Sequence, residues 1–180
     1  MTLPPHYRRN FAALLGDYIG FALGMTFAST TTVLPALVGY MTDSEVAVGL
    51  LSTVSNGAWL LPQLIYANLI THKRRKKPYV TLGAIIGRPF VLFYAAALGL
   101  GIYQYPILAL LLLFGAQIIF FGTDALAAVA WFDVVSKAIP DRRRGRLFGG
   151  GQLISGLLAI SAGAVIAALL ATDGPPFPQN

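Results

Sequence analysis

Three charged residues stand inside long apolar stretches of the sequence: Asp17, Arg88 and Asp124. A charge in apolar surroundings is costly unless it is paired or reaches water. A carboxylate held in such a place can carry a proton or contact a solute, and a nearby guanidinium would tune its proton affinity. The structural alternative is a fixed ion pair that holds segments of the chain together. Both interpretations depend on the elements that position these three residues.

Three uncharged polar residues extend this set: Asn56, Gln63 and Gln117. Asn56 and Gln63 are seven residues apart, and so are Gln117 and Asp124, which places each pair on one face of a helix. Such faces could line a path for a polar solute. Hydrogen bonds between neighbouring helices are the alternative for each residue.

The sequence offers little for enzyme chemistry. Cysteine is absent, and the two histidines, His6 and His72, lie near the ends of apolar blocks, so no buried metal cluster is predicted. The run "GGGQ" lacks the Lys-Ser/Thr pair of a phosphate-binding loop. We therefore predict no enzyme activity, no cofactor and no metal.

The elements that must hold these residues are long apolar blocks. Hydrophobic residues make up 56% of the chain and charged residues only 11%, whereas a soluble domain carries about 25% charged residues. Each block is longer than the roughly 18 residues that mark a membrane-spanning helix. We predict an all-α, polytopic transmembrane helix bundle in a single domain, 1–180. Its five spans are expected at about 14–38, 46–70, 79–101, 107–130 and 147–171.

Apart from Arg88, the cations lie before the first block or in alternate connections between the blocks. Arg8 and Arg9 precede the first block, residues 73–77 are five consecutive cations, and five more cations lie in 137–146. The segments 39–45, 102–106 and 172–180 contain no Lys or Arg. Cytoplasmic loops of membrane proteins hold the cations, so the N-terminus is predicted to be cytoplasmic. A nucleic-acid partner is not predicted, because the cations follow membrane sidedness instead of forming a soluble basic face.

Helical rise places the three charges of the apolar blocks in the inner half of the predicted membrane. Their heights above the inner boundary are roughly 5 Å for Asp17, 10 Å for Asp124 and 13 Å for Arg88. These depths are close enough for pairing.

Small residues recur at every fourth position in the first and fifth blocks. They include Gly16, Gly20 and Gly24 in the first block and Gly151, Ser155 and Gly163 in the fifth. Close backbone approach over small residues drives helix association in lipid. We predict that these two helices pack against each other or each against another close neighbour. The general abundance of Gly and Ala in membrane helices is the alternative explanation.

Local features predict where some helices begin or break. In "TDSE", Thr42 and Glu45 have the spacing of a capping box at the start of the second helix. Pro35 and Pro89 are predicted to interrupt spanning helices.

Three stretches together resemble the N-terminal half of a major facilitator superfamily transporter. "VLPALVGYMTDSEVAVGLL" is similar to the Leu-Pro end of helix 1 and the Gly-Leu of helix 2 in that family. "ANLITHKRRKKPYV" resembles the helix 2–3 motif, with matches at Leu69, Arg75 and Lys76. "IPDRRRGRLFGGGQLISGLL" resembles the helix 4–5 turn, with Arg144 and Gly145 followed by a Gly-rich helix start.

The chain departs from the helix 2–3 motif at three positions. Ala67 stands where Gly is usual, Thr71 where the acidic residue is usual, and Arg74 at the second Gly. The missing carboxylate leaves the family's cytoplasmic gate ion pair without its usual acid. Asp133, at the inner end of the fourth helix, is a candidate substitute.

The resemblance implies a secondary active transporter that moves a small solute by alternating access. It implies five of the six helices of one half-domain, with a sixth span and a C-terminal half missing from this chain. The partners would be the lipid bilayer, a small-molecule solute, protons as a candidate coupling ion, and that missing half. By the same resemblance Asp17 and Asp124, on helices 1 and 4, would face the central cavity, and Arg88 would be structural. The expected location is the cytoplasmic (plasma) membrane.

A second function class stays open. The chain could be a non-transporting integral membrane subunit or anchor that scaffolds partners through its basic cytoplasmic loops.

Overall fold

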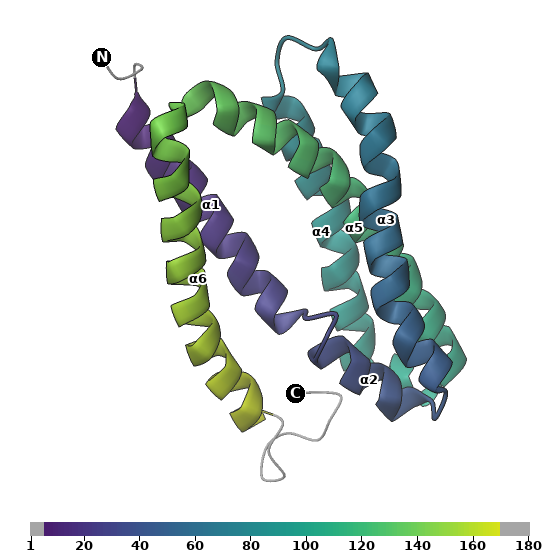
Figure 1. Ribbon diagram of the computed structural model, residues 1–180. Coiled ribbons are helices and arrows are strands. Elements are labelled where there is room, and N and C mark those ends of the chain that lie inside the picture. The colour runs from purple at the N-terminus through teal and green to yellow at the C-terminus, as the bar shows by residue number, and fades with distance from the viewer. Residues whose placement is uncertain (1–5, 170–180) are drawn as a thin grey trace. The chain divides into compact units, whose positions relative to one another are not determined.

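The computed structural model describes residues 6–169, and every regular element in that part of the chain is a helix (Figure 1). In chain order the elements are α1 (Tyr7–Phe27), α2 (Val33–Met41), α3 (Glu45–Thr71), α4 (Lys77–Gly99), the 3-10 helix η1 (Ile102–Gln104), α5 (Pro106–Ala138) and α6 (Asp141–Leu169). The prediction of an all-α protein is thus confirmed for residues 6–169, which contain six α-helices. The last positions of the block at 147–171 and the cation-free tail at 172–180 lie outside the described residues.

The described chain forms two compact units. The first contains residues 6–29 and 133–169, and therefore α1, α6 and the last turns of α5. The second contains residues 30–132, and therefore α2, α3, α4, η1 and most of α5.

Three of the described helices, α4, α5 and α6, are long and apolar enough to cross a membrane. The 33 residues of α5 would reach about 50 Å, which exceeds the roughly 30 Å of a bilayer's hydrocarbon core. α1 and α3 have 21 and 27 residues but more polar sequences, and neither is among the three. Length and composition therefore identify three candidate spans among residues 6–169.

The predicted single helix at 14–38 is wrong, because that block holds two helices. α1 ends at Phe27 and α2 begins at Val33. The intervening residues include Ser29 and three threonines at 30–32, whose side chains compete with the backbone for hydrogen bonds and disfavour a helix interior. Pro35 falls in the first turn of α2, where its missing N–H has no intrahelical partner to lose.

The start of α3 is capped by a different residue from the one predicted. Ser44 is the N-cap, and its hydroxyl accepts a hydrogen bond from the backbone N–H of Ala47 at 3.3 Å. The hydroxyl of Thr42 instead accepts from the N–H of Ser44 at 3.2 Å, which forms a tight turn before the helix. Thr42 is therefore a turn residue and not the cap. The interruption predicted at Pro89 is absent, since Pro89 lies inside the continuous helix α4.

The second unit is held together by contacts of α5 with α3 and α4. At one end, Ile70 of α3 is buried with Leu126 and Ala130 of α5, and Tyr66 and Tyr79 pack against this cluster. Further along, α4 and α5 pack closely at a glycine of α4.

Gly83 lies at the close contact between α4 and α5. A Cβ atom added there would lie 2.5 Å from the carbonyl oxygen of Thr123 and 2.9 Å from the Cβ of Ala127. No side chain larger than hydrogen fits at that distance, so Gly83 sets how closely α4 and α5 pack.

In the first unit, α1 and α6 lie side by side and run in the same direction (Figure 1). The ring of Tyr18 on α1 lies over Gly151 of α6, where an added Cβ would be 2.6 Å from a ring carbon. The same ring meets Phe148 edge-on, with 6.4 Å between ring centroids. At the start of both helices, the guanidinium of Arg143 stacks over Tyr7 at 5.2 Å from the ring centroid.

Candidate functional site

The helices that carry most of the predicted solute-path residues meet at one level of the second unit. A Cβ on Gly122 of α5 would lie 3.8 Å from the carbonyl oxygen of Ala58 on α3. A Cβ on Gly87 of α4 would collide with the hydroxyl of Thr123 on α5. α3, α4 and α5 therefore converge around residues 58, 87 and 122–123.

Arg88 and Asp124 lie at nearly the same height in this unit. Each directly follows a contact residue, Gly87 or Thr123, and one residue advances a helix by only about 1.5 Å. They do not form an ion pair. Arg88 is exposed and has no carboxylate partner within residues 6–169, whereas half-buried Asp124 interacts with another group. The guanidinium therefore remains available to a group outside the described chain.

The three amide side chains lie in different surroundings. Gln117 on α5 is buried. Gln63 on α3 is half-buried, and its Nε2 is enclosed without a hydrogen-bond acceptor in the described part of the chain. Asn56 is exposed, and its Nδ2 donates to the carbonyl oxygen of Ser52 at 2.8 Å. Of the three, Gln63 has an unsatisfied donor that a solute or another helix could use.

Ser55 is a polar residue of α3 that sequence reasoning missed. Only 2% of it is exposed, and its hydroxyl has no hydrogen-bond partner among residues 6–169. It precedes Gln63 by eight residues, a spacing that keeps two side chains on nearly the same helix face. That spacing could have added Ser55 to the predicted polar set.

Asp17 does not belong to this group of helices. It is exposed on α1, in the first unit, whereas the other five predicted path residues belong to the second unit.

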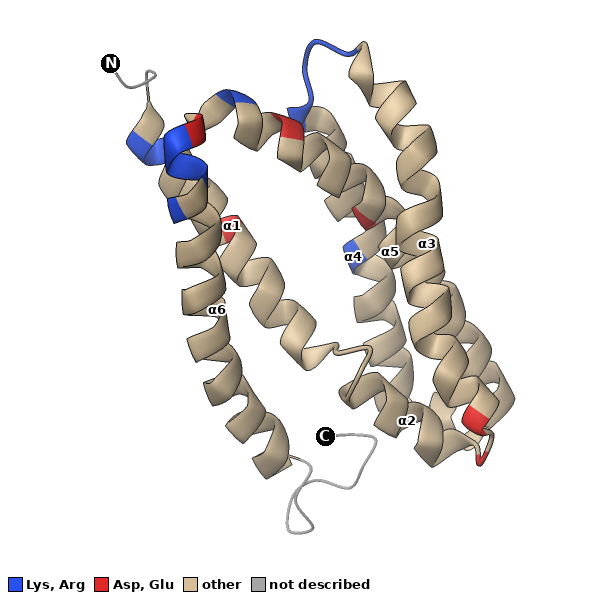
Figure 2. Cartoon of the chain, in the orientation of Figure 1, with Lys and Arg blue, Asp and Glu red and all other residues tan. Residues whose placement is uncertain are grey.

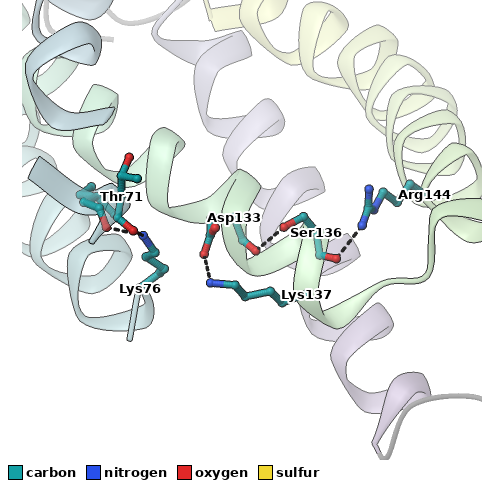
Figure 3. A network of polar contacts seen from close by, with 7 residues as sticks. Thr71, Lys76, Asp133, Ser136, Lys137 and Arg144 are labelled. Carbon is teal, nitrogen blue, oxygen red and sulfur yellow. Dashed lines mark hydrogen bonds and ion pairs between the residues drawn. The ribbon is translucent and has the colours of Figure 1, made fainter. Parts of the chain in front are cut away.

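The contacts of Lys76, a predicted gate residue, explain its position at the end of α3. Its side chain is buried, and its ammonium donates to the backbone carbonyl oxygens of Ile70 and Thr71, the latter at 3.2 Å (Figure 3). A cation at the carboxyl end of a helix satisfies otherwise unpaired carbonyl groups and complements the helix dipole. Lys76 therefore caps the C-terminus of α3. The other two matches to the helix 2–3 motif, Leu69 and Arg75, are exposed.

The gate candidates of the first unit make local contacts (Figure 3). Asp133 binds Lys137, one turn further along α5, with 2.6 Å between Oδ2 and Nζ. Arg144 donates to the carbonyl oxygens of Ser136 at 2.5 Å and Ile139 at 3.1 Å, and pairs with Asp141 at 2.6 Å. It thus caps the C-terminus of α5 as Lys76 caps α3.

The predicted packing residues contribute unequally. A Cβ added to Gly16, Gly20, Gly24 or Gly163 would meet nothing within 4 Å, and the same is true of the gate candidate Gly145. The hydroxyl of Ser155 is buried without a hydrogen-bond partner in the described chain. Of the predicted packing glycines, Gly151 lies at a close helix contact.

The glycines at the tightest contact of the second unit were missed. Gly83 and Gly87 have the Gly-x-x-x-Gly spacing that lets two membrane helices approach closely. The spacing was visible in the sequence as "GAIIG".

The described chain contains no group of side chains that is suited to binding a metal ion. Within residues 6–169, no three His, Cys, Asp or Glu side chains come together so that they could hold a metal ion. The arrangement instead offers polar and charged groups along apolar helices. No protein-family model, no curated protein and no solved structure matches this chain.

Proposed function

We propose that the chain is part of a secondary active transporter that moves a small solute across a membrane by alternating access. In this proposal α1 and α3 span the bilayer together with α4, α5 and α6, which gives five spans of a six-helix half-domain. The resemblance to the major facilitator superfamily supports the order of these spans. No nucleotide-binding motif is present in the sequence, so transport would be driven by an ion gradient or by the gradient of the solute.

The observation that carries the proposal is the separation of charge along the helices of the second unit. The carboxylates Asp43 and Glu45 lie at the start of α3, and five consecutive cations follow its end (Figure 2). The 27 residues of α3 separate these ends by about 40 Å, enough to place them on opposite sides of a bilayer. Cations at the end of α3 and none at its start are the pattern expected of a membrane helix that is oriented by the positive-inside rule.

The first unit has the same polarity. Arg8 and Arg9 begin α1, and Arg142, Arg143 and Arg146 begin α6. Because α1 and α6 run side by side in the same direction, their cations gather at one end of that unit (Figure 2). This supports a common cytoplasmic end for both helices.

The polar residues inside the second unit support a solute path over a purely structural bundle. Gln63 and Ser55 have buried donor atoms with no acceptor in the described chain, and Arg88 has no counter-charge there. Unpaired polar groups are costly within a membrane and mark solute or ion pathways. We assign Arg88, Gln63 and Asp124 as the residues of this chain that contact the solute or a coupled proton.

Flux through the natural full-length protein in liposomes tests the proposal. We expect at least one small polar solute to enter protein-containing liposomes faster than empty ones, and replacement of Arg88 by Gln to reduce that flux. A panel of sugars, amino acids, carboxylates and organic cations would cover the main solute classes. Flux equal to that of empty liposomes for every class would contradict the proposal.

A further inference from the structure

The turn between α3 and α4 presents an unusual concentration of positive charge. Lys73, Arg74, Arg75 and Lys77 are all exposed, and none has a side-chain hydrogen bond or a carboxylate partner within residues 6–169. The remaining cation, Lys76, is turned inward and caps α3. Lys76 thereby closes the turn and leaves the other four cations on its outer surface.

In the second basic turn, between α5 and α6, several cations have partners within the chain. Lys137 pairs with Asp133, Arg144 pairs with Asp141, and each ion pair has 2.6 Å between the charged atoms. Arg143 stacks on an aromatic ring. In that turn the sequence supplies carboxylates beside the cations, whereas 72–77 contains none and the nearest exposed carboxylates of its unit are at the far end of α3.

Exposed apolar side chains flank the cations of the first turn along the chain. Leu69 precedes the turn and is 53% exposed, and Leu82, one turn into α4, is 47% exposed. Tyr79 packs beneath the turn, on the cluster around Ile70. Aromatic side chains of this kind are enriched at the boundary between headgroups and hydrocarbon.

We propose that Lys73, Arg74, Arg75 and Lys77 form a binding surface for the headgroup of an anionic phospholipid. Guanidinium groups bind phosphate oxygens in a bidentate manner, and clusters of cations next to a membrane helix attract anionic lipids. The exposed leucines beside the cations would contact the acyl chains of the same lipid molecule. A soluble anion would use only the charged half of this surface, which is why a lipid fits better.

The inference requires that the helices are embedded in a bilayer, as proposed above, but not that the chain transports a solute. Its test measures lipid binding and not flux, so the two proposals can fail separately.

The test is lipid retention by the purified full-length protein in mixed micelles, measured by native mass spectrometry. The probes are dioleoyl phosphatidylglycerol and dioleoyl phosphatidylcholine, which share acyl chains and differ in headgroup charge. We expect preferential retention of phosphatidylglycerol. In the Arg74→Gln/Arg75→Gln variant that preference should fall by roughly tenfold, because each cation near an anionic headgroup adds to the attraction.

The matched control removes the same charge from the other turn. Arg142→Gln/Arg146→Gln replaces two exposed arginines of α6 and should retain most of the preference. Lys76→Met should lower the thermal stability of the chain but leave the preference for phosphatidylglycerol, because Lys76 caps α3 and does not face the lipid. Equal loss in the arginine control would overturn the proposal, since net charge alone would then explain the binding.

Two further measurements test whether the surface prefers a lipid to a soluble anion, and whether the preference depends on charge. Glycerol 3-phosphate in excess should not displace the bound lipid, and displacement would show that the surface selects a soluble anion. With the unmodified chain, raising the salt concentration should weaken the preference, because screening reduces contacts between exposed charges. A preference that salt leaves unchanged would overturn the proposal even if the arginine variant failed to fold.

Discussion

At the scale of single residues, small and charged side chains determine how the helices of this chain can approach one another. Gly83 and Gly87 bring α4 against α5, while Gly16, Gly20 and Gly24 face open space in the described structure. A glycine matters for packing only where a neighbouring backbone or ring occupies the space of its missing Cβ. Spacing alone does not distinguish the two situations.

Replacement of Gly83 by Ala tests this distinction. The new Cβ would lie 2.5 Å from the carbonyl oxygen of Thr123, so the backbone of α4 or α5 must move. We expect a loss of about 1–3 kcal/mol in the free energy of unfolding, as is typical for overpacking. The matched control is Gly115→Ala on α5, where an added Cβ meets nothing within 4 Å.

The control should be neutral or slightly stabilising, because Ala favours a helix over Gly by about 0.5–1 kcal/mol. Thermal unfolding in detergent, followed by circular dichroism, measures both variants. If Gly83→Ala melts at the temperature of the unmodified chain, close packing of α4 on α5 is refuted.

A second residue-scale prediction concerns Asp124. If this half-buried carboxylate carries a proton during transport, Asp124→Asn in the full-length protein should remove the dependence of flux on pH. The asparagine side chain has nearly the same shape and cannot bind or release a proton. Asp17→Asn serves as the comparison, because Asp17 is exposed in the other unit. The measurement is solute flux in liposomes across a range of pH values, and an unchanged pH profile in Asp124→Asn would exclude the role.

At the scale of elements, helix ends are set by local hydrogen bonds that apolar periodicity does not reveal. The blocks predicted at 46–70 and 79–101 correspond closely to α3 and α4. Charged residues flank both ends of the first block, whereas the second block is preceded by cations and followed by a turn with glycine. The predicted helix at 14–38 was wrong because its mean apolar character hid the hydroxyl-rich residues 29–32. α5 extends eight residues beyond the predicted 130, since its last turns stay helical although they include Asp133, Ser136 and Lys137.

The N-cap of α3 gives an element-scale prediction. Ser44→Ala removes the hydroxyl that accepts from the N–H of Ala47, and loss of an N-cap costs about 1 kcal/mol. Thr42→Ala removes only a turn contact before the helix and should cost less. Chemical or thermal unfolding of the two variants in the same detergent measures the difference. A larger effect of Thr42→Ala would restore Thr42 as the functional cap.

At the scale of the whole molecule, the sequence indicated which residue types would be buried but not which contacts they would make. Three amide side chains stand within apolar blocks of the sequence, and in the structure Gln117 is buried, Gln63 half-buried and Asn56 exposed. The cap that Lys76 places on α3 could not be predicted, because it depends on how a turn of five residues folds back on the preceding helix. Likewise the pairing of Asp133 with Lys137 competes with any role of that carboxylate as a gate. The apolar blocks can be identified from the sequence because the surrounding solvent selects for them. Polar contacts cannot, because they depend on which residues become neighbours when the chain folds.

The orientation of the helices in the membrane is the last prediction, and the absence of cysteine from the 180 residues makes it direct to test. Single-cysteine variants at Glu45, Lys73 and Arg142 are treated in intact cells with a membrane-impermeant maleimide. Glu45→Cys should react at once, because the start of α3 is expected outside. Lys73→Cys and Arg142→Cys should react only after the membrane is permeabilised, because cation-rich connections stay in the cytoplasm. Labelling of positions 45 and 73 from the same side would mean that α3 does not cross the membrane, and a transporter built on alternating spans would then be excluded.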